Sequence, residues 1–394
     1  MNRRRSSRTV LLALAGVAGL SSPVFAQSLF SSRGLGIPLI ATDARALALG
    51  GMGIGLTGGE LSVVDPSAAA RLRIPSVAFS FQSSWADTDE DGTPGDFSGT
   101  RFPFIALGYP SRIGTVTVSF GGVLDQRWTA ESSRLIDLDQ PGRQGRVFDR
   151  FVSDGGVSSV RFGIARSVAP GIDVGFQVGR NIGDVSRVFT RRFDSLDVGT
   201  VIAPFQAGGR WSYRGWMASA GASADIGTVL HLSAAYTWSG DLDALPDEQT
   251  VGGEASFGLP SELRAGATAL LSPQLSAIIG IHRASWSGGN EGLAGGARDT
   301  FSWGGGVEWA GARILGKDSS LRVGYRGSQL PFTVEGALEP TESAFAAGLG
   351  MNLLTSGEAL LARLDLALER GLRQASSFEE RFWRLSTSVR ISGF

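Results

Sequence analysis

The sequence predicts an all-β protein, a membrane-spanning antiparallel β-barrel of about 14 strands with an N-terminal hatch, meaning a segment that fills the lumen. Three observations support this fold class. The chain opens with an export signal, apolar and polar residues alternate from Ser76 onward, and short connections alternate with long ones. The predicted parts are a signal peptide at 1–26, a hatch at 27–75 and a barrel at 76–394.

The first residues, MNRRRSSRTVLLALAGVAGLSSPVFAQS, have the three parts of a secretory signal peptide. Four arginines give a basic start, and residues 10–20 form an apolar core that is too short for a membrane anchor. Val24 and Ala26 are aliphatic or small residues at the positions that a signal peptidase reads. We therefore expect cleavage near Ala26 and export of the remaining chain.

The composition excludes several classes of function. The net charge of −1 gives no bulk attraction to nucleic acid. The chain has no cysteine, which excludes disulfides, thiolate chemistry and cysteine metal sites. No apolar run after the signal approaches the ~18 residues of a membrane helix. An exported chain of this kind is periplasmic, secreted or an outer-membrane barrel, and the strand pattern decides among these classes.

Alternation with period two is clear in the stretch GIDVGFQVG. Ile172, Val174 and Phe176 fall on one face of an extended chain, and the polar Asp173 and Gln177 fall on the other. Such segments have close to the ~9–11 residues that a tilted membrane strand needs. They begin near the following residues: Ser76, Arg101, Ile113, Val157, Gly171, Gly209, Thr228, Glu262, Gln274, Thr300, Ser320, Glu342, Glu358 and Phe382.

Connections between these segments alternate in length, as in outer-membrane barrels with short periplasmic turns and long extracellular loops. The short ones are 110–112, 169–171, 226–228, 272–274, 313–319 and 355–357. The long ones are 86–100, 125–156, 184–208, 239–260, 287–299, 329–341 and 371–381. Tryptophans lie where strands meet the long connections and predict an interfacial girdle. They are Trp85, Trp211, Trp238, Trp286, Trp303 and Trp383.

Two sets of residues fall on the inward register. The glycines there indicate close backbone approach by a segment inside the lumen, and they are Gly163, Gly175, Gly179, Gly266, Gly280, Gly304, Gly306, Gly324, Gly348 and Gly350. The polar candidates are Arg161, Arg264, His282, Glu308, Arg322, Arg326, Arg384 and Arg390. They predict either a structural network of ion pairs or an arginine cluster that receives the carboxylate of an amphiphile.

The stretch GGMGIGLTGG, residues 50–59, contains the G-x-G-x-x-G pattern of dinucleotide sites. No buried strand precedes it and no βαβ rhythm exists in the chain, so we expect no nucleotide binding. Residues 27–75 are rich in small residues and do not alternate, which predicts a hatch. The glycines would then provide positive φ angles and close packing. Asp65 would pair with a lumen arginine or cap a turn at Pro66.

The segment 43–72 resembles the N-terminal region of the FadL-type outer-membrane transport superfamily, which includes PorV-like proteins of a secretion system. Ala44-Arg45-Ala46 and Gly50-Gly51-Met52-Gly53 match its pattern, and Asp65-Pro66-Ser67-Ala68 stands in place of Asn-Pro-Ala. The resemblance implies a barrel of about 14 strands with an N-terminal hatch. The hatch or gate candidates are Arg45, Gly50, Gly51, Gly53, Gly55, Asp65 and Pro66.

Two functions follow from the resemblance. The first is diffusion of small hydrophobic or amphipathic, fatty-acid-like compounds through a hatch-gated lumen, and the alternative is a PorV-like component of a secretion or envelope complex. An apolar pocket from the long-loop side to the hatch favours the first. A solid, charged lumen with an apolar extracellular rim favours the second.

The predicted location is the outer membrane of a Gram-negative bacterium. The expected partners are outer-membrane lipid, lipopolysaccharide, and the barrel assembly machinery, which would read the terminal Phe394. The long connections 125–156 and 184–208 mix Arg and Asp, which predicts a solvated surface or contact with lipopolysaccharide phosphates. No Ser–His spacing is informative and no His/Asp/Glu spacing suits a metal, so we expect no enzyme activity, metal or cofactor.

Overall fold

The structure is a computed structural model that describes residues 28–40, 42–58, 61–90, 93–137, 144–194, 203–250, 252–287, 296–332, 339–357, 359–375 and 378–393. The predicted signal peptide, its cleavage site near Ala26 and the terminal Phe394 lie outside the described residues. None of the described helices is long and apolar enough to cross a membrane.

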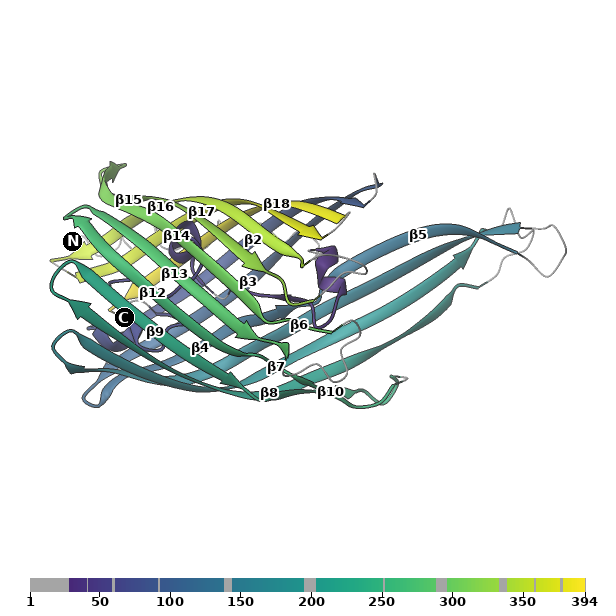
Figure 1. Ribbon diagram of the computed structural model, residues 1–394, viewed down its shortest axis with the longest axis horizontal. Coiled ribbons are helices and arrows are strands. Elements are labelled where there is room, and N and C mark those ends of the chain that lie inside the picture. Colours follow the sequence, from purple (N-terminus) through teal and green to yellow (C-terminus); the bar gives the residue numbers. More distant parts are fainter. Residues whose placement is uncertain are drawn as a thin grey trace, which may run out of the picture.

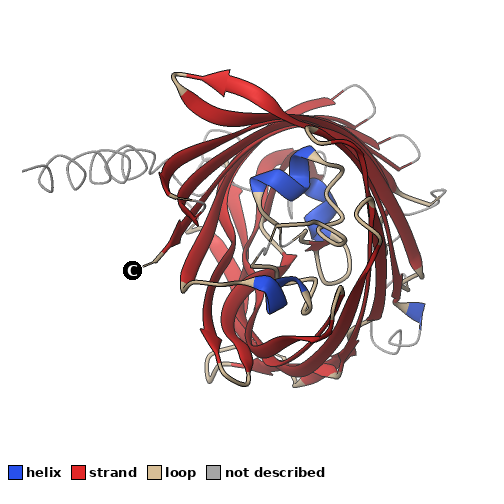
Figure 2. Cartoon of the chain, turned by 90° about the vertical axis from the view of Figure 1, so that its left-hand side faces the viewer, coloured by secondary structure: helices blue, strands red, loops and turns tan. Residues whose placement is uncertain are grey.

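The described strands close into an antiparallel barrel of fourteen strands, as predicted (Figures 1 and 2). Three wall strands are each divided in two, so that β4 continues as β5, β9 as β10 and β11 as β12. The last strand pairs with the first, from Ser392 opposite Ser76 to Phe378 opposite Glu90.

The bounds of the wall strands are β2 (Ser76–Glu90), β3 (Thr93–Ser111), β4 (Gly114–Asp125), β5 (Trp128–Asp137), β6 (Gln144–Ala169), β7 (Ile172–Phe193), β8 (Phe205–Ile226), β9 (Leu230–Ser239), β10 (Asp241–Pro246), β11 (Ala255–Gly258), β12 (Ser261–Ser272), β13 (Leu275–Ser285), β14 (Thr300–Ile314), β15 (Lys317–Gln329), β16 (Thr341–Ser356), β17 (Ala359–Ala375) and β18 (Phe378–Ser392).

The period-two alternation divides the two faces of the wall. On β7, Ile172, Val174 and Phe176 are 44%, 38% and 50% exposed on the outside. The intervening Asp173 and Gln177 are buried inside. An apolar outer wall around a polar interior is unfavourable in water and favourable in lipid. The alternation prediction is therefore confirmed.

Short turns lie together at one end of the barrel, the left-hand end of Figure 1. The long connections differ from the prediction, because much of 86–100, 125–156, 184–208 and 371–381 is strand. Strands β5, β6, β7 and β8 remain paired well beyond the rest of the wall and form a projection at the other end (Figure 1). Cross-strand packing continues along it, with the rings of Phe151 and Phe189 4.6 Å apart.

The predicted tryptophan girdle is correct for four residues and wrong for two. Trp85, Trp238, Trp303 and Trp383 are 42–51% exposed on the outer wall. Trp286 is only 4% exposed because it follows the end of β13 and packs inside against Phe332, with ring centroids 5.2 Å apart. Trp211 shares the inward register of β8 with the buried Tyr213 and packs against an interior apolar cluster.

The N-terminal segment, residues 28–75, lies within the ring of strands (Figure 2). It contains η1 (Leu29–Ser32), β1 (Ile37–Pro38), α2 (Ala44–Ala48) and η2 (Ala68–Arg71). Helix α2 begins after Asp43, whose carboxylate accepts a 2.7 Å hydrogen bond from the Ala46 amide. All five helical residues are buried, and the helix packs against β15, β16, β17 and β18.

Candidate functional site

Glycine backbones form much of the contact between the N-terminal segment and the wall. A Cβ added at Gly50 would lie 2.4 Å from the backbone nitrogen of Gly305. A Cβ added at Gly55 would lie 2.8 Å from the carbonyl carbon of Gly266. At Gly175 it would lie 2.0 Å from the carbonyl oxygen of Pro66. Side chains at these positions are therefore incompatible with the observed docking.

The prediction that inward glycines permit a segment in the lumen holds for seven positions. An added Cβ would meet the N-terminal segment at Gly175, Gly266, Gly280, Gly304, Gly306, Gly324 and Gly348. It fails for Gly163, Gly179 and Gly350, where an added Cβ would instead meet neighbouring wall residues.

Glycines of the segment itself have positive φ angles, which L side chains rarely adopt. The φ values are +95° at Gly50, +75° at Gly51, +67° at Gly53 and +75° at Gly55. These angles turn the chain sharply after α2, and an added Cβ at Gly51 would lie 2.9 Å from Cδ of Arg326.

Asp65 is buried and caps the turn at Pro66, because its Oδ1 accepts a 3.0 Å hydrogen bond from the Ser67 amide. Its Oδ2 accepts a 2.7 Å hydrogen bond from the Ser233 hydroxyl of the wall. Among the described residues no arginine pairs with Asp65, so of the two expectations for this residue the structure shows the cap.

Arg45 connects α2 to the wall through a buried set of charges that we call the α2 network. Its Nε lies 2.8 Å from Oε2 of Glu308, and its Nη1 donates a 2.8 Å hydrogen bond to the carbonyl of Thr57. Arg322 extends the network, because its Nε lies 3.1 Å from Oε2 of Glu308 and its Nη1 lies 2.7 Å from Oδ1 of Asp365. Removing one partner of such a buried ion pair destabilises the folded protein, because the other charge is left buried without a partner.

A second set of charges, the β15–β18 network, lines the wall beside the segment. Arg326 pairs with Glu342 and, at 2.7 Å, with Glu369. Arg384 lies 2.8 Å from the other oxygen of Glu369. Arg373 joins Glu342, at 2.5 Å, to Glu380. Two of the lumen candidates, Arg326 and Arg384, are therefore paired with carboxylates, and Arg373, which the sequence analysis did not single out, belongs to the same network.

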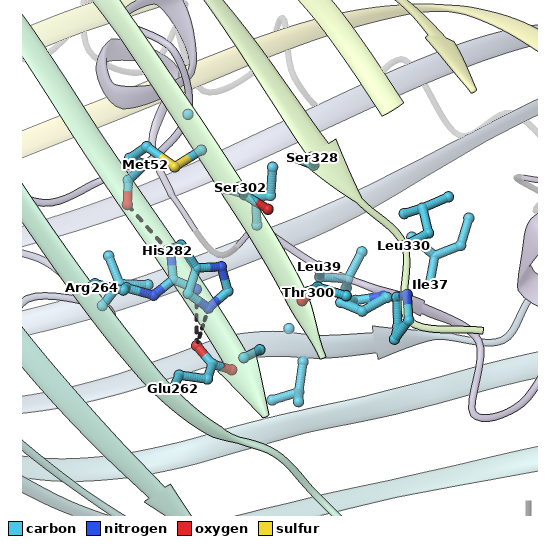
Figure 3. A pocket seen from close by; sticks show the side chains of 18 of the residues that line it. Ile37, Leu39, Met52, Glu262, Arg264, His282, Thr300, Ser302, Ser328 and Leu330 are labelled. Atoms are coloured by element: carbon cyan, nitrogen blue, oxygen red, sulfur yellow. Dashed lines mark hydrogen bonds and ion pairs between the residues drawn. The ribbon is translucent and has the colours of Figure 1, made fainter. Parts of the chain in front are cut away.

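A cavity of about 130 Å³ lies between the N-terminal segment and the wall (Figure 3). Three of its lining residues form a cluster on β12 and β13, in which Glu262 lies 3.0 Å from Arg264 and 3.1 Å from Nε2 of His282. Arg264 also donates a 3.4 Å hydrogen bond to the carbonyl of Met52 (Figure 3). The cluster thus connects the cavity to the segment.

Arg161 lines the same cavity and donates hydrogen bonds to the Ser159 hydroxyl, at 2.8 Å, and to the Val63 carbonyl, at 2.6 Å. Among the described residues no carboxylate lies within ion-pair distance of Arg161. Arg390, the last lumen candidate, is half-buried opposite Arg363 and does not line the cavity.

An apolar cluster, which we call the mouth cluster, lies inside the barrel where the projection begins. Its buried members are Leu35, Leu124, Val157, Val185, Tyr213, Leu242, Ala244, Leu259, Ala284, Trp286, Ala297 and Phe332. Two of them, Ala284 and Trp286, also line the cavity. The sequence analysis did not predict the mouth cluster, although two large aromatic residues on the inward register of β8, Trp211 and Tyr213, indicate an apolar region inside the barrel.

The wall has a seam between β3 and β4. Their pairing runs only from Ser111 opposite Gly114 to Phe104 opposite Gly121. Beyond this point β3 pairs with β2 alone, and β4 and β5 pair with β6. The two strands therefore leave facing edges without a shared ladder.

The N-terminal segment covers part of this seam. Strand β1 pairs with the freed edge of β4, with Ile37 opposite Asp125 and Pro38 opposite Leu124. Arg127 bridges the seam by donating a 2.9 Å hydrogen bond to the carbonyl of Thr100 on β3, while its guanidinium lies 2.9 Å from Asp125.

The two histidines have carboxylate neighbours and no metal-binding arrangement. His231 Nδ1 lies 2.7 Å from Asp225, and His282 pairs with Glu262 as described. Within the described part of the chain no group of three or more His, Asp or Glu side chains could hold a metal ion.

Comparison with known proteins identifies the fold. No protein-family model and no curated protein matches the chain. The CymD monoaromatic hydrocarbon channel is 14% identical, with 91% of this chain and 98% of that chain covered and a TM-score of 0.56. A Pseudomonas aeruginosa FadL homologue is 12% identical, with 90% and 99% covered and a TM-score of 0.59. The toluene transporter TodX of P. putida is 13% identical, with 92% and 98% covered and a TM-score of 0.56. This chain therefore has the fold of the FadL-type outer-membrane channels.

Proposed function

We propose that this chain is an outer-membrane channel for small hydrophobic or amphipathic compounds, and that its N-terminal segment is the hatch of the channel. The observation that carries the proposal is the continuity between the mouth cluster and the cavity. Ala284 and Trp286 belong to both, and Leu39 and Met52 of the segment also line the cavity. An apolar solute would thus pass from the mouth to the segment.

The charges of the cavity support an amphipathic substrate with an anionic head, such as a fatty acid. Arg161 has no carboxylate partner among the described residues, and Arg264 shares Glu262 with His282. A guanidinium pairs well with a carboxylate through parallel hydrogen bonds. The mouth cluster would bind the hydrocarbon chain while the carboxylate is held at Arg161.

The seam between β3 and β4 supplies the route out of the cavity. Strand β1 occupies the freed edge of β4 through Ile37 and Pro38, and the cavity is lined by these same two residues. Displacement of β1 would open the cavity to the seam. The hatch and the wall opening are then two parts of one gate.

The secretion-component alternative has less support. It required a solid, charged lumen with an apolar extracellular rim; the lumen is charged and the mouth is apolar, but the lumen is not solid, because a cavity lies between the segment and the wall. The similar structures include a hydrocarbon channel and a toluene transporter, which supports a role in the passage of small molecules. We propose no catalytic role for the two histidines.

A matched pair of ligands tests the proposal. Purified protein in mild detergent should bind dodecanoate and dodecanol, which differ only in the head group. Arg161→Gln should weaken dodecanoate binding about tenfold or more, as expected for loss of a charged hydrogen bond, and leave dodecanol binding unchanged. Absence of binding to both ligands by the wild-type protein would contradict the proposed function.

A further inference from the structure

The outer wall carries an exposed cluster of two arginines and a tryptophan on β7 and β8. Arg180 lies opposite Trp216 in the strand register, and its guanidinium carbon is 5.4 Å from the centroid of the indole ring. Trp216 is 58% exposed. Arg214 precedes Trp216 by two residues on β8, so it lies on the same outward face, and it is also exposed. We call these three residues the β7–β8 cluster.

The position of this cluster is unusual for charge. Along β7, Arg180 is flanked on the outward face by Val178 and Ile182, which are 44% and 39% exposed. Placing a guanidinium on the lipid-facing surface costs free energy, and this cost decreases from the membrane midplane towards the interface. Tryptophan prefers this interface, so the cluster lies where lipid head groups begin.

No carboxylate among the described residues lies within ion-pair distance of Arg180 or Arg214. Two acidic residues on these strands, Asp184 and Asp243, have other hydrogen-bond partners. Asp184 lies 3.6 Å from Arg210 and accepts a 2.8 Å hydrogen bond from Ser212. Asp243, opposite Arg214 in the register, accepts a 2.8 Å hydrogen bond from the hydroxyl of Ser256. The Ser256 hydroxyl leaves the charge of Asp243 in place, so Arg214 has a carboxylate opposite it on β10 that forms no ion pair with it, whereas Arg180 faces Trp216 and has no carboxylate opposite it in the register.

A row of small side chains leads from the cluster into the apolar band. The outward residues of β8 beyond Trp216 are Ala218, Ala220, Ala222 and Ala224. On β7 they face Val178, Phe176, Val174 and Ile172, and on β9 they face Trp238, Tyr236, Ala234 and Leu232. The alanine row is thus bordered by larger side chains on both strands, except at Ala234. It provides a lane for an acyl chain that starts at the two arginines.

We propose that the β7–β8 cluster binds a phosphate of lipid A, the phosphorylated glycolipid of the outer leaflet, and that one acyl chain lies along the alanine row. Guanidinium groups bind phosphate oxygens through charge-assisted hydrogen bonds. Strands β7 and β8 continue past the cluster into the projection (Figure 1), which lies at the end of the long connections, the outside of the cell. The site is separate from the lumen and independent of what the channel transports.

A second Arg–Trp contact on the outer wall, between β17 and β18, serves as a control. Arg370 on β17 lies 5.3 Å from the ring centroid of Trp383 on β18, with the same outward exposure. Its outward neighbours along β17 are leucines rather than alanines, and Arg381 nearby already lies 2.7 Å from Glu379. The Arg370–Trp383 site has no second arginine available and no alanine row. Arg370→Gln therefore removes an Arg–Trp contact at a site that should not bind lipid A.

The test measures bound lipid A per barrel by native mass spectrometry, after delipidation and titration with lipid A. The double variant Arg180→Gln/Arg214→Gln should bind roughly tenfold more weakly than wild type, the change expected for loss of charged contacts. Ala220→Phe should also weaken binding with both arginines present, and Arg370→Gln should bind as wild type does. All variants should keep the heat-dependent gel mobility of a folded barrel.

Two lipid controls define the chemistry. Dephosphorylated lipid A should bind as weakly as the double variant binds lipid A, and phosphatidylglycerol should not compete at equal concentration. Unchanged occupancy in the folded double variant would overturn the proposal. Equal binding of dephosphorylated lipid A would also overturn it, and full competition by phosphatidylglycerol would overturn the assignment to a glycolipid.

Discussion

Gly55→Ala places one methyl group at the contact between the N-terminal segment and the wall. Gly55 has a φ of +75°, and its added Cβ would lie 2.8 Å from the carbonyl carbon of Gly266 and 3.0 Å from the nitrogen of Ala267. Both atoms belong to the backbone of β12, so they cannot rotate away from the methyl group as a flexible side chain would. The segment must shift instead.

The size of the effect follows from two terms. A left-handed backbone costs a non-glycine residue about 1–2 kcal/mol, and overpacking costs about 1–3 kcal/mol. Gly316 separates them, because its φ is +73° and nothing lies within 4 Å of its added Cβ. Gly316→Ala therefore carries the first term alone. The second term should shift the equilibrium between seated and displaced segment about 5- to 150-fold.

The assay compares both variants with wild type in liposomes, by the rate at which a small hydrophobic solute enters. Gly55→Ala should increase this rate, and Gly316→Ala should leave it unchanged, while both retain the gel mobility of the folded barrel. Equal rates for the two alanine variants would refute the reasoning, because the steric contact would then have no effect on passage.

Three further predictions concern the segment, the mouth cluster and assembly. Arg45→Ala should raise solute entry, because it removes the 2.8 Å pair with Glu308; protease sensitivity of the segment measures its displacement. Trp286→Ala should lower the free energy of unfolding by about 3–5 kcal/mol, since it removes the contact with Phe332, and it should also weaken dodecanol binding; fluorescence titration measures the binding, and unchanged affinity would exclude the mouth cluster from the route. Deletion of Phe394 should lower the amount of assembled barrel and leave export intact, as measured by heat-dependent mobility of membrane extracts.

The wall could be predicted because its signal is local. A strand places successive side chains on opposite faces, so the exposure of Val174 and the burial of Asp173 follow from their neighbours in sequence. Short turns follow from the same pattern. The projection was missed because alternation there continues through segments whose charges resemble those of loops, as in Asp149 paired with Arg191 at 2.7 Å.

The site could be predicted only in part because its contacts are distant in sequence. Inward arginines were found from strand register, but the pairing of Arg45 with Glu308 joins residues 263 positions apart. The seam also escaped prediction, because alternation identifies the faces of a strand and carries no information on where its ladder ends. Trp286 was misplaced because it follows the last residue of β13, where the alternation rule no longer applies.

The central claim is that β1 must leave the edge of β4 for a solute to pass, and a reversible crosslink tests it most directly. The chain has no cysteine, so Pro38→Cys/Leu124→Cys introduces a single pair. The Leu39 amide donates a 2.9 Å hydrogen bond to the Val123 carbonyl. The next pair in the register, Pro38 and Leu124, is therefore a non-hydrogen-bonded pair, in which the Cα atoms are ~4.5 Å apart. This distance lies within the ~4.4–6.8 Å range that disulfides span. Hydrophobic solute entry into liposomes should stop in the oxidised variant and return on reduction. Equal entry through the oxidised and reduced forms, with the disulfide verified by mass spectrometry, would contradict the account.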